Sequence, residues 1–316
     1  MQEVMDQIRV FLKTASRPLL VVLGPTASGK TGYSIDLALS LGSEGRGAEI
    51  INADSRQLYR YLDIGTAKIT PEEMRGVPHH LLACLDPKEE VTAAWYKREA
   101  VRVIGDILKR GRIPMLVGGS MLYLSAVIDN LEFVAESDPV PRKKLSAEYD
   151  LDQGTTLMKK LGELDPETAL SIEPRNKVYL IRALEICLLQ NDRASRAKKK
   201  SACPYDLFIV GITRPREELH RRISERLHHM FAAGWAEEVR HLLARGYTVN
   251  DPGLQSHGYR EIAEAISNGQ WIMGNGQCGS VKNALLQEIA AKTRQYAKRQ
   301  MTWWRGDERI RWIESS

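Results

Sequence analysis

One segment, Gly24-Pro-Thr-Ala-Ser-Gly-Lys-Thr31, constrains the fold of this chain more than any other. It matches the pattern GxxxxGK followed by Ser or Thr. It stands between an apolar run, Leu19–Leu23, and a segment with apolar residues at helical spacing, Thr31–Leu41. The backbone N–H groups of such a loop converge on an anion, and the following helix adds the positive end of its dipole. The pattern therefore predicts a strand, a phosphate-binding loop and a helix in direct succession.

Two side chains of the loop have predicted chemical roles. Lys30 can reach a terminal phosphate, and the hydroxyl of Thr31 can bind Mg²⁺. The expected diphosphate- or nucleotide-binding residues are those of the loop itself: Gly24, Pro25, Thr26, Ala27, Ser28, Gly29, Lys30 and Thr31. The loop alone predicts a polyphosphate site and not ATP hydrolysis, because any diphosphate fits it. A motor ATPase would carry an Asp at a second strand end, whereas the apolar run 113–117 ends in Gly118-Gly119-Ser120.

Short apolar runs recur along the chain, separated by helical or loop segments. Besides the run before the phosphate loop, they are Glu49–Ile51, His80–Leu82, Ile113–Val117, Leu207–Ile212 and Ile310–Ile313. Strands that alternate with helices favour a parallel sheet covered on both faces. We therefore predict an α/β fold with a P-loop NTPase-like parallel sheet flanked by helices.

The sequence changes character between Asp129 and about Tyr205, where the strand signals disappear. Proline-bounded polar turns and helical runs such as Val178–Gln190 take their place, and a basic stretch, Arg193–Lys200, closes the region. This predicts a mostly helical insertion domain, residues 129–206. The catalytic core would then comprise residues 1–128 and 207–316, with basic helices in its C-terminal part.

Composition argues against several other classes of protein. The chain has 316 residues, a formal charge of +5 and four cysteines that form no CxxC pair, so neither a zinc site nor a disulfide framework is indicated. The N-terminus lacks the apolar core of a signal peptide. No stretch approaches the roughly 18 uninterrupted apolar residues of a membrane span. We expect a cytoplasmic monomer with no membrane segment.

A second polar group follows the second predicted strand. Asp54-Ser-Arg-Gln57 should lie at the carboxyl edge of the sheet, beside the phosphate loop, where open α/β sheets bind ligands. Asp54 at that edge suits a general base or a Mg²⁺ partner, but Asp is also common as the N-cap of a helix. Gly118-Gly119-Ser120 ends another strand at the same edge, and its glycines leave room for close approach to a ligand.

Eight further segments complete a recognisable set. They are Asn52-Ala-Asp-Ser-Arg-Gln-Leu-Tyr59, Asp63-Ile-Gly-Thr-Ala-Lys68, Val77-Pro-His-His-Leu81, Val117-Gly-Gly-Ser-Met-Leu-Tyr123, Arg182-Ala-Leu-Glu185, Gly258-Tyr-Arg-Glu-Ile262, Thr293-Arg-Gln-Tyr-Ala-Lys-Arg-Gln300 and Thr302-Trp-Trp-Arg305. With the phosphate loop, they resemble the tRNA dimethylallyltransferases (the tRNA isopentenyltransferase family), in family order across nearly the whole chain. DSRQ, DIGTAK and TRQYAKRQ together are highly specific.

The resemblance implies an enzyme that uses Mg²⁺ and transfers a dimethylallyl group from dimethylallyl diphosphate to tRNA. The acceptor would be N6 of the adenosine 3′-adjacent to the anticodon, and diphosphate would be released. Asp54 matches the family's general base, and Lys30 and Ser120 join it as expected catalytic residues. Ser120 stands where the family usually has Thr. Arg226 matches an arginine associated with the diphosphate, and Lys68 is a weaker candidate of the same kind.

The resemblance also implies contacts with the tRNA anticodon stem-loop. The matching residues are Asp54, Ser55, Arg56, Gln57, Ser120, Arg182, Gln255, Gly258, Tyr259 and Arg260. The helical insertion would contact the anticodon arm.

Three other functions stay open. One is an adenylate isopentenyltransferase acting on free AMP, ADP or ATP, although a mononucleotide needs neither the helical insertion nor the basic C-terminal helix. The second is a P-loop kinase of small molecules. The third is an RNA-binding protein without catalytic activity.

Overall fold

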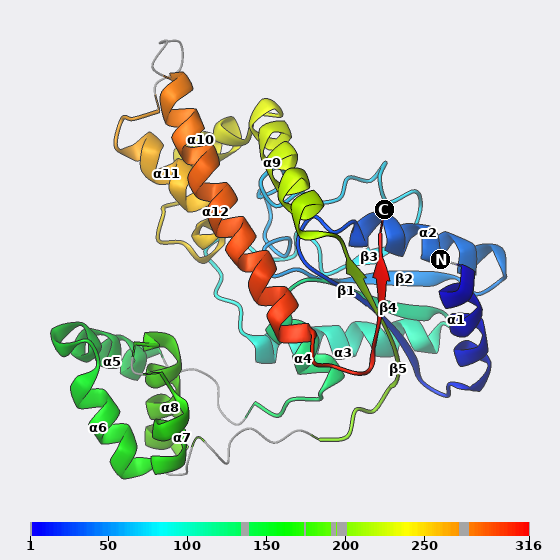
Figure 1. Ribbon diagram of the computed structural model, residues 1–316, viewed down its shortest axis with the longest axis horizontal. Helices are drawn as coiled ribbons and strands as arrows, with labels where there is room; N and C mark the ends of the chain where they lie inside the picture. Colours follow the sequence, from blue (N-terminus) through cyan, green and yellow to red (C-terminus); the bar gives the residue numbers. More distant parts are fainter. Residues whose placement is uncertain are drawn as a thin grey trace. The chain divides into compact units, whose positions relative to one another are not determined.

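The computed structural model describes residues 2–133, 139–173, 175–190, 194, 201–271 and 278–315 (Figure 1). These form two compact units, Met1–Leu124 with Pro204–Ser316, and Ser125–Cys203. We call them the core unit and the helical unit. The basic stretch 193–200 lies outside the described residues apart from Ala194, as do Ser137 and Asp138 of a predicted turn.

The core unit contains a six-stranded sheet in the order β3-β2-β4-β1-β5-β6. The strands are β1 (Pro18–Leu23), β2 (Ala48–Ala53), β3 (His79–His80), β4 (Ile113–Gly118), β5 (Asp206–Thr213) and β6 (Ile310–Glu314). All five pairings are parallel, which confirms the predicted sheet. The predicted strand 80–82 is shorter than expected, because Leu81 has a φ of 57° and leaves the extended conformation.

The central strands β1 and β4 are buried on both faces, which explains why they are apolar throughout rather than alternating. In β1, Leu20 and Val22 belong to a cluster with apolar side chains of α1 (Gln2–Thr14) and α2 (Lys30–Ser43). Successive side chains of a strand point to opposite faces. The other face therefore receives Leu19, Val21 and Leu23, and α3 (Ala93–Lys109) packs there against β2 and β4.

The remaining elements of the core unit lie between β4 and β6 in sequence. They are α4 (Met121–Ile128, which crosses the unit boundary), α9 (Arg216–Ala232), α10 (Trp235–Ala244), a short 3₁₀ helix (Pro252–Gln255), α11 (Tyr259–Ser267) and α12 (Cys278–Trp304). The long α12 runs beside α9 and leads into β6 (Figure 1). This places side chains of a C-terminal helix near loops that come from the first half of the chain.

The helical unit contains α5 (Pro139–Asp152), α6 (Thr155–Leu164), α7 (Pro166–Ser171) and α8 (Lys177–Gln190). Its apolar core includes Leu145, Leu157, Leu180 and Leu184. The Asp165-Pro166 turn begins α7, with Asp165 as the N-cap that accepts the Thr168 N–H at 3.2 Å. Proline at the first helical position and Asp before it are the expected signals of a helix start.

Candidate active site

The phosphate loop leaves β1 at Leu23 and passes close to the neighbouring strand. Gly24 has a φ of 149°, and a Cβ at this position would lie 2.2 Å from the carbonyl oxygen of Ile212 in β5. Only glycine fits there. The loop then ends at the start of α2, where the exposed Thr31 lies in the first turn.

Charged side chains converge on this loop from other elements. Lys30 Nζ donates to the Pro25 carbonyl at 2.7 Å. Burial lowers the pKa of Lys30 to about 8, Asp54 acts in the opposite direction, and Arg226 lowers it further. Burial also lowers the pKa of Arg226, which Asp54 opposes. Lys30, Asp54 and Arg226 are therefore close enough to influence one another, so the structure brings three of the predicted site residues together.

Two further arginines fix the outer side of the loop. Arg222 Nε donates to the Ala27 carbonyl at 3.0 Å, and Arg214 Nε donates to the Ser28 carbonyl at 3.0 Å. The hydroxyl of Ser28 is fully buried and has no hydrogen-bond partner in the described part of the chain.

Asp54 begins a turn directly after β2. Its Oδ1 accepts the Arg56 N–H at 2.9 Å, and its own N–H donates to Asn52 Oδ1 at 3.0 Å. No helix follows, so the alternative of a helix N-cap does not apply. Ser120, at the end of β4, accepts the Ser55 N–H at 2.8 Å and thereby joins the two strand ends. The Asp54 carboxylate is thus held by backbone geometry and is half-buried at the carboxyl edge of the sheet.

α12 joins this turn to the phosphate loop. The amide of Gln300 accepts the Thr26 N–H at 2.9 Å and donates to the Gly119 carbonyl at 2.7 Å. One helical turn earlier, Tyr296 donates to the same Gly119 carbonyl at 3.3 Å.

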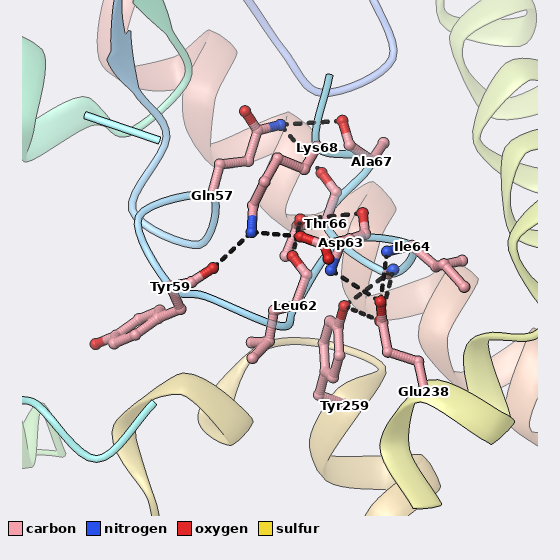
Figure 2. Close-up of polar contacts among 11 residues, drawn as sticks. Gln57, Tyr59, Leu62, Asp63, Ile64, Thr66, Ala67, Lys68, Glu238 and Tyr259 are labelled. Atoms are coloured by element: carbon pink, nitrogen blue, oxygen red, sulfur yellow. Dashed lines mark hydrogen bonds and ion pairs between the residues drawn. The ribbon is translucent and has the colours of Figure 1, made fainter. Parts of the chain in front are cut away.

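The DIGTAK segment forms a loop that a single carboxylate holds in place (Figure 2). Glu238 of α10 accepts the N–H groups of Asp63 and Ile64, each at 2.9 Å, and that of Gly65 at 3.5 Å. Tyr259 donates its hydroxyl to the same carboxylate at 2.5 Å and accepts the Gly65 N–H at 3.0 Å. Three backbone donors converging on one carboxylate fix the course of the loop.

Side chains of the same region are tied to that loop. Lys68 Nζ donates to the Tyr59 carbonyl at 2.6 Å and to Asp63 Oδ1 at 2.7 Å (Figure 2). Because Lys68 is buried in these contacts, it does not suit the diphosphate contact predicted as a weaker candidate. Gln57 donates to the carbonyls of Thr66 and Ala67 at 3.1 and 3.2 Å. Arg226 Nη2 lies 3.4 Å from the Thr66 carbonyl, so the loop also anchors this arginine.

Comparison with known proteins identifies the family. A family model described as IPP transferase matches residues 57–307. The chain belongs to the IPP transferase family. A tRNA dimethylallyltransferase of Geobacter sulfurreducens is 38% identical over 299 residues, which are 94% of this chain and 91% of the relative. One of Thermobifida fusca is 40% identical over 295 residues, or 93% and 89% of the two chains.

Solved structures agree with this membership. The full-length tRNA isopentenylpyrophosphate transferase of Bacillus halodurans has a TM-score of 0.66 and 36% identity, over 95% of this chain and 90% of that one. A eukaryotic dimethylallyltransferase described as acting on tRNA has a TM-score of 0.77 and 25% identity, over 95% and 74% of the two chains.

The residues predicted to contact tRNA fall into three groups in this IPP transferase. Arg56 and Gln57 lie half-buried beside Asp54, and Gln255 and Arg260 are exposed around the start of α11. Arg260 pairs with Glu264 at 2.8 Å. Arg182 belongs to the helical unit, where it pairs with the fully buried Glu185 at 2.8 Å. The RNA contacts themselves stay predictions.

Gly258 and Tyr259 are placed differently from the expectation. Both are buried, and a Cβ on Gly258 would lie 2.0 Å from the Trp235 ring. The Tyr259 hydroxyl is occupied by Glu238 and the Gly65 N–H. A direct contact between these two residues and RNA does not fit this arrangement. They shape the loop before α11 instead.

Sequence reasoning missed four side chains that touch the site: Arg214, Arg222, Tyr296 and Gln300. The sequence could have predicted Arg214 as a site residue, because Arg214 follows β5 at the same carboxyl edge as Asp54 and Ser120. Tyr296 and Gln300 lie in the TRQYAKRQ segment, whose specificity marked the family without indicating what these side chains do. Their contacts with residues far away in sequence leave no local pattern.

Proposed function

We propose that this protein transfers the dimethylallyl group of dimethylallyl diphosphate to N6 of the adenosine 3′-adjacent to the anticodon in tRNA. One observation carries the proposal: a complete phosphate loop and the carboxylate of Asp54 share the carboxyl edge of one sheet, and Asp54 is close enough to oppose the lowering of the Lys30 pKa by burial. A polyphosphate leaving group and a proton acceptor are the two parts that this reaction needs.

The phosphate loop suits the diphosphate of the donor. The fully buried Ser28 hydroxyl, without a partner among the described residues, is available to a phosphate oxygen. Lys30 and Arg226 bring two positive charges to the same place. As the allylic C–O bond breaks, its electron pair stays on the departing diphosphate, and these cations stabilise the charge that develops there.

Asp54 suits the acceptor side. The N6 amine forms a bond to the allylic carbon and must lose one proton. The Asp54 carboxylate is fixed by the Arg56 N–H and lies at the sheet edge where the diphosphate leaves. It can accept that proton. Ser120 holds the next residue of the turn and keeps the carboxylate in position.

Mg²⁺ is part of the proposal. The described residues contain no group of three or more His, Cys, Asp or Glu side chains that could hold a metal ion. A Mg²⁺ ion that arrives with a diphosphate keeps phosphate oxygens and waters as ligands and needs few from the protein. The exposed Thr31 hydroxyl at the start of α2 fits such a sparse set. When bound, the ion would neutralise charge on the leaving diphosphate.

RNA is favoured over a free nucleotide as acceptor for two reasons. The relatives named tRNA dimethylallyltransferase match 93–94% of this chain, so the helical unit is part of what they share. Beside the site, α12 also carries the exposed Arg299, whose guanidinium lies 5.8 Å from the centre of the Tyr296 ring. No helix among the described residues is both long and apolar enough to span a bilayer.

The test follows radiolabel from the donor. Labelled dimethylallyl diphosphate and Mg²⁺ are incubated with undermodified tRNA, with the same tRNA carrying guanosine at the target position, and with AMP. We expect label in the first acceptor alone and one diphosphate released for each group transferred.

Three results would overturn the proposal. Label in AMP but not in tRNA would indicate an adenylate isopentenyltransferase. Transfer of the γ-phosphate from ATP to an acceptor would indicate a kinase. Tight tRNA binding without any transfer would indicate an RNA-binding protein.

A further inference from the structure

Three polar residues of α12 lie four positions apart, and each contacts a different part of the core unit. Lys292 Nζ donates to Glu261 at 2.6 Å, and the other carboxylate oxygen of Glu261 accepts the Gly258 N–H at 2.6 Å. Tyr296 and then Gln300 follow. A spacing of four places side chains on one face of a helix. This face of α12 therefore runs from the loop before α11 to the phosphate loop.

Gln300 is the member of this row that contacts both substrate sites. Its side chain is 1% exposed, and both ends of its amide are used, one toward the Thr26 N–H and one toward the Gly119 carbonyl. A carboxylate of the same length has no proton to donate to Gly119, and a methionine can do neither. Among side chains of this length, glutamine supplies one acceptor and one donor without any change of protonation.

The surroundings of Gln300 leave little freedom. A Cβ on Gly119 would lie 2.2 Å from Gln300 Nε2, so glycine at position 119 makes room for the amide. The two hydrogen-bond partners of Gln300, Thr26 and Gly119, belong to segments that carry different predicted catalytic residues. Thr26 belongs to the loop that ends in Lys30. Gly119 precedes Ser120, whose hydroxyl holds the Ser55 N–H next to Asp54.

We propose that Gln300 is a positioning residue that sets the separation between the phosphate loop and the turn carrying Asp54. It touches no reacting atom. It acts by fixing Thr26 and Gly119 at once, so that the donor's allylic carbon and the base lie in register when both substrates are bound. The inference rests on the proposed prenyl transfer for its kinetic consequence, whereas the structural role of the amide is independent of the reaction.

Two variants separate the two hydrogen bonds. Gln300→Met keeps the length and loses both bonds, and Gln300→Glu keeps the acceptor for the Thr26 N–H but loses the donor to Gly119. Gln295→Met, on an exposed position of the same helix, is the matched control. Displacement of reacting groups by about 1 Å can cost on the order of 10²-fold in rate. We expect kcat to fall about 100-fold in Gln300→Met and at least tenfold in Gln300→Glu, with the Kd for tRNA within about threefold of wild type.

Hydrogen exchange supplies a readout that needs no activity. In Gln300→Met, the peptide covering the phosphate loop should exchange faster, while peptides of β1 and β5 keep their protection. In Gln300→Glu, the loop peptide should stay protected although kcat is low. Only a changed separation between the phosphate loop and the turn carrying Asp54 predicts a protected loop together with a low kcat.

The outcomes divide cleanly. If wild type transfers no label to tRNA, the proposed function fails, and the exchange pattern still decides whether Gln300 holds the loop. If wild type is active and Gln300→Met matches Gln295→Met in kcat, the positioning role is wrong. If both Gln300 variants lose protection throughout the core unit, the amide serves stability alone, which also overturns the inference.

Discussion

The core unit differs from the helical unit in the hydrogen bonds that its buried polar groups make across long sequence separations. In the core unit these groups join residues far apart in sequence, such as Thr26 with Gln300 and Ser55 with Ser120. In the helical unit, Asp165 caps its own helix, and Glu185 pairs with Arg182 one turn away. The helical unit also exposes large apolar side chains, with Leu170 and Leu151 91% and 86% exposed.

This difference indicates a division of tasks. Long-range hydrogen bonds fix atoms from several elements relative to one another, which is what a reaction between two substrates needs. A small apolar core with local polar contacts keeps four helices folded but fixes no catalytic geometry. Substitutions of polar residues should therefore affect turnover in the core unit, and substitutions of apolar residues should affect local stability in the helical unit.

The largest effect is expected from removing the proton acceptor. Asp54→Asn keeps an oxygen for the Arg56 N–H, so the turn should retain its shape. General-base catalysis typically contributes about 10² to 10⁴-fold, and we expect kcat to fall by that amount. Single-turnover prenyl transfer at saturating donor measures it.

Asp54→Asn should change turnover without changing tRNA affinity or stability. The Kd for tRNA and the unfolding midpoint in urea should match wild type. A variant that retains full turnover would mean that Asp54 belongs to the turn and not to the chemistry.

The next largest effect is expected in the helical unit. Leu180 is fully buried in its apolar cluster, and Leu→Ala substitutions in cores cost about 2–5 kcal/mol. Leu180→Ala should raise hydrogen exchange in α5, α6 and α8 by a corresponding factor while β1 and β4 keep their protection. Val178→Ala, at a position that is 66% exposed, is the matched control and should cost less than about 0.5 kcal/mol.

The division between the units would fail if Leu180→Ala loosened the sheet as much as the helices. In that case the two units would share one cooperative core.

A smaller effect is expected from the Glu238 clamp in the core unit. Glu238→Gln replaces one acceptor oxygen by an NH₂ group that must face backbone N–H groups of the DIGTAK loop. Hydrogen bonds to a charged group contribute roughly 1.5–3 kcal/mol, so we expect a loss of about 2 kcal/mol in the free energy of unfolding. Turnover should fall as well, because the loop anchors Arg226.

Glu237→Gln, in the same turn of α10, provides the comparison and should change stability by no more than about 0.5 kcal/mol. Equal effects of the two substitutions would show that charge at the start of α10 matters and the clamp does not.

The same contrast explains how far the sequence could predict the structure. The phosphate loop, the parallel sheet, the polar turn at Asp165-Pro166 and the placement of Asp54 and Ser120 at one sheet edge all depend on local patterns. Periodicity and turn chemistry record such patterns within a few residues. Lys68 was read as a candidate for the diphosphate because the sequence cannot show that Tyr59 and Asp63 already occupy its ammonium group.

The residues that the sequence did not predict owe their positions to contacts between residues far apart in sequence. Nothing near Gln300 in sequence indicates that its amide meets Thr26, 274 positions earlier. Tyr259 was assigned to RNA because it lies in a family motif, whereas its burial against Glu238 follows from how α10 and α11 pack. Tertiary contacts of this kind need coordinates.

The smallest effect concerns Ser120, whose hydroxyl links the ends of β2 and β4. Its hydroxyl accepts the Ser55 N–H, and the side chain is buried. Ser120→Ala would leave that N–H without its acceptor, at a cost of about 1 kcal/mol in stability and a fall in kcat of several-fold. Ser120→Thr keeps the hydroxyl and adds only a methyl group, so kcat should stay within about threefold of wild type. Steady-state kinetics of both variants decide which feature matters: if Thr impairs turnover more than Ala, shape rather than the hydroxyl governs this position, and the core unit would depend on packing as the helical unit does.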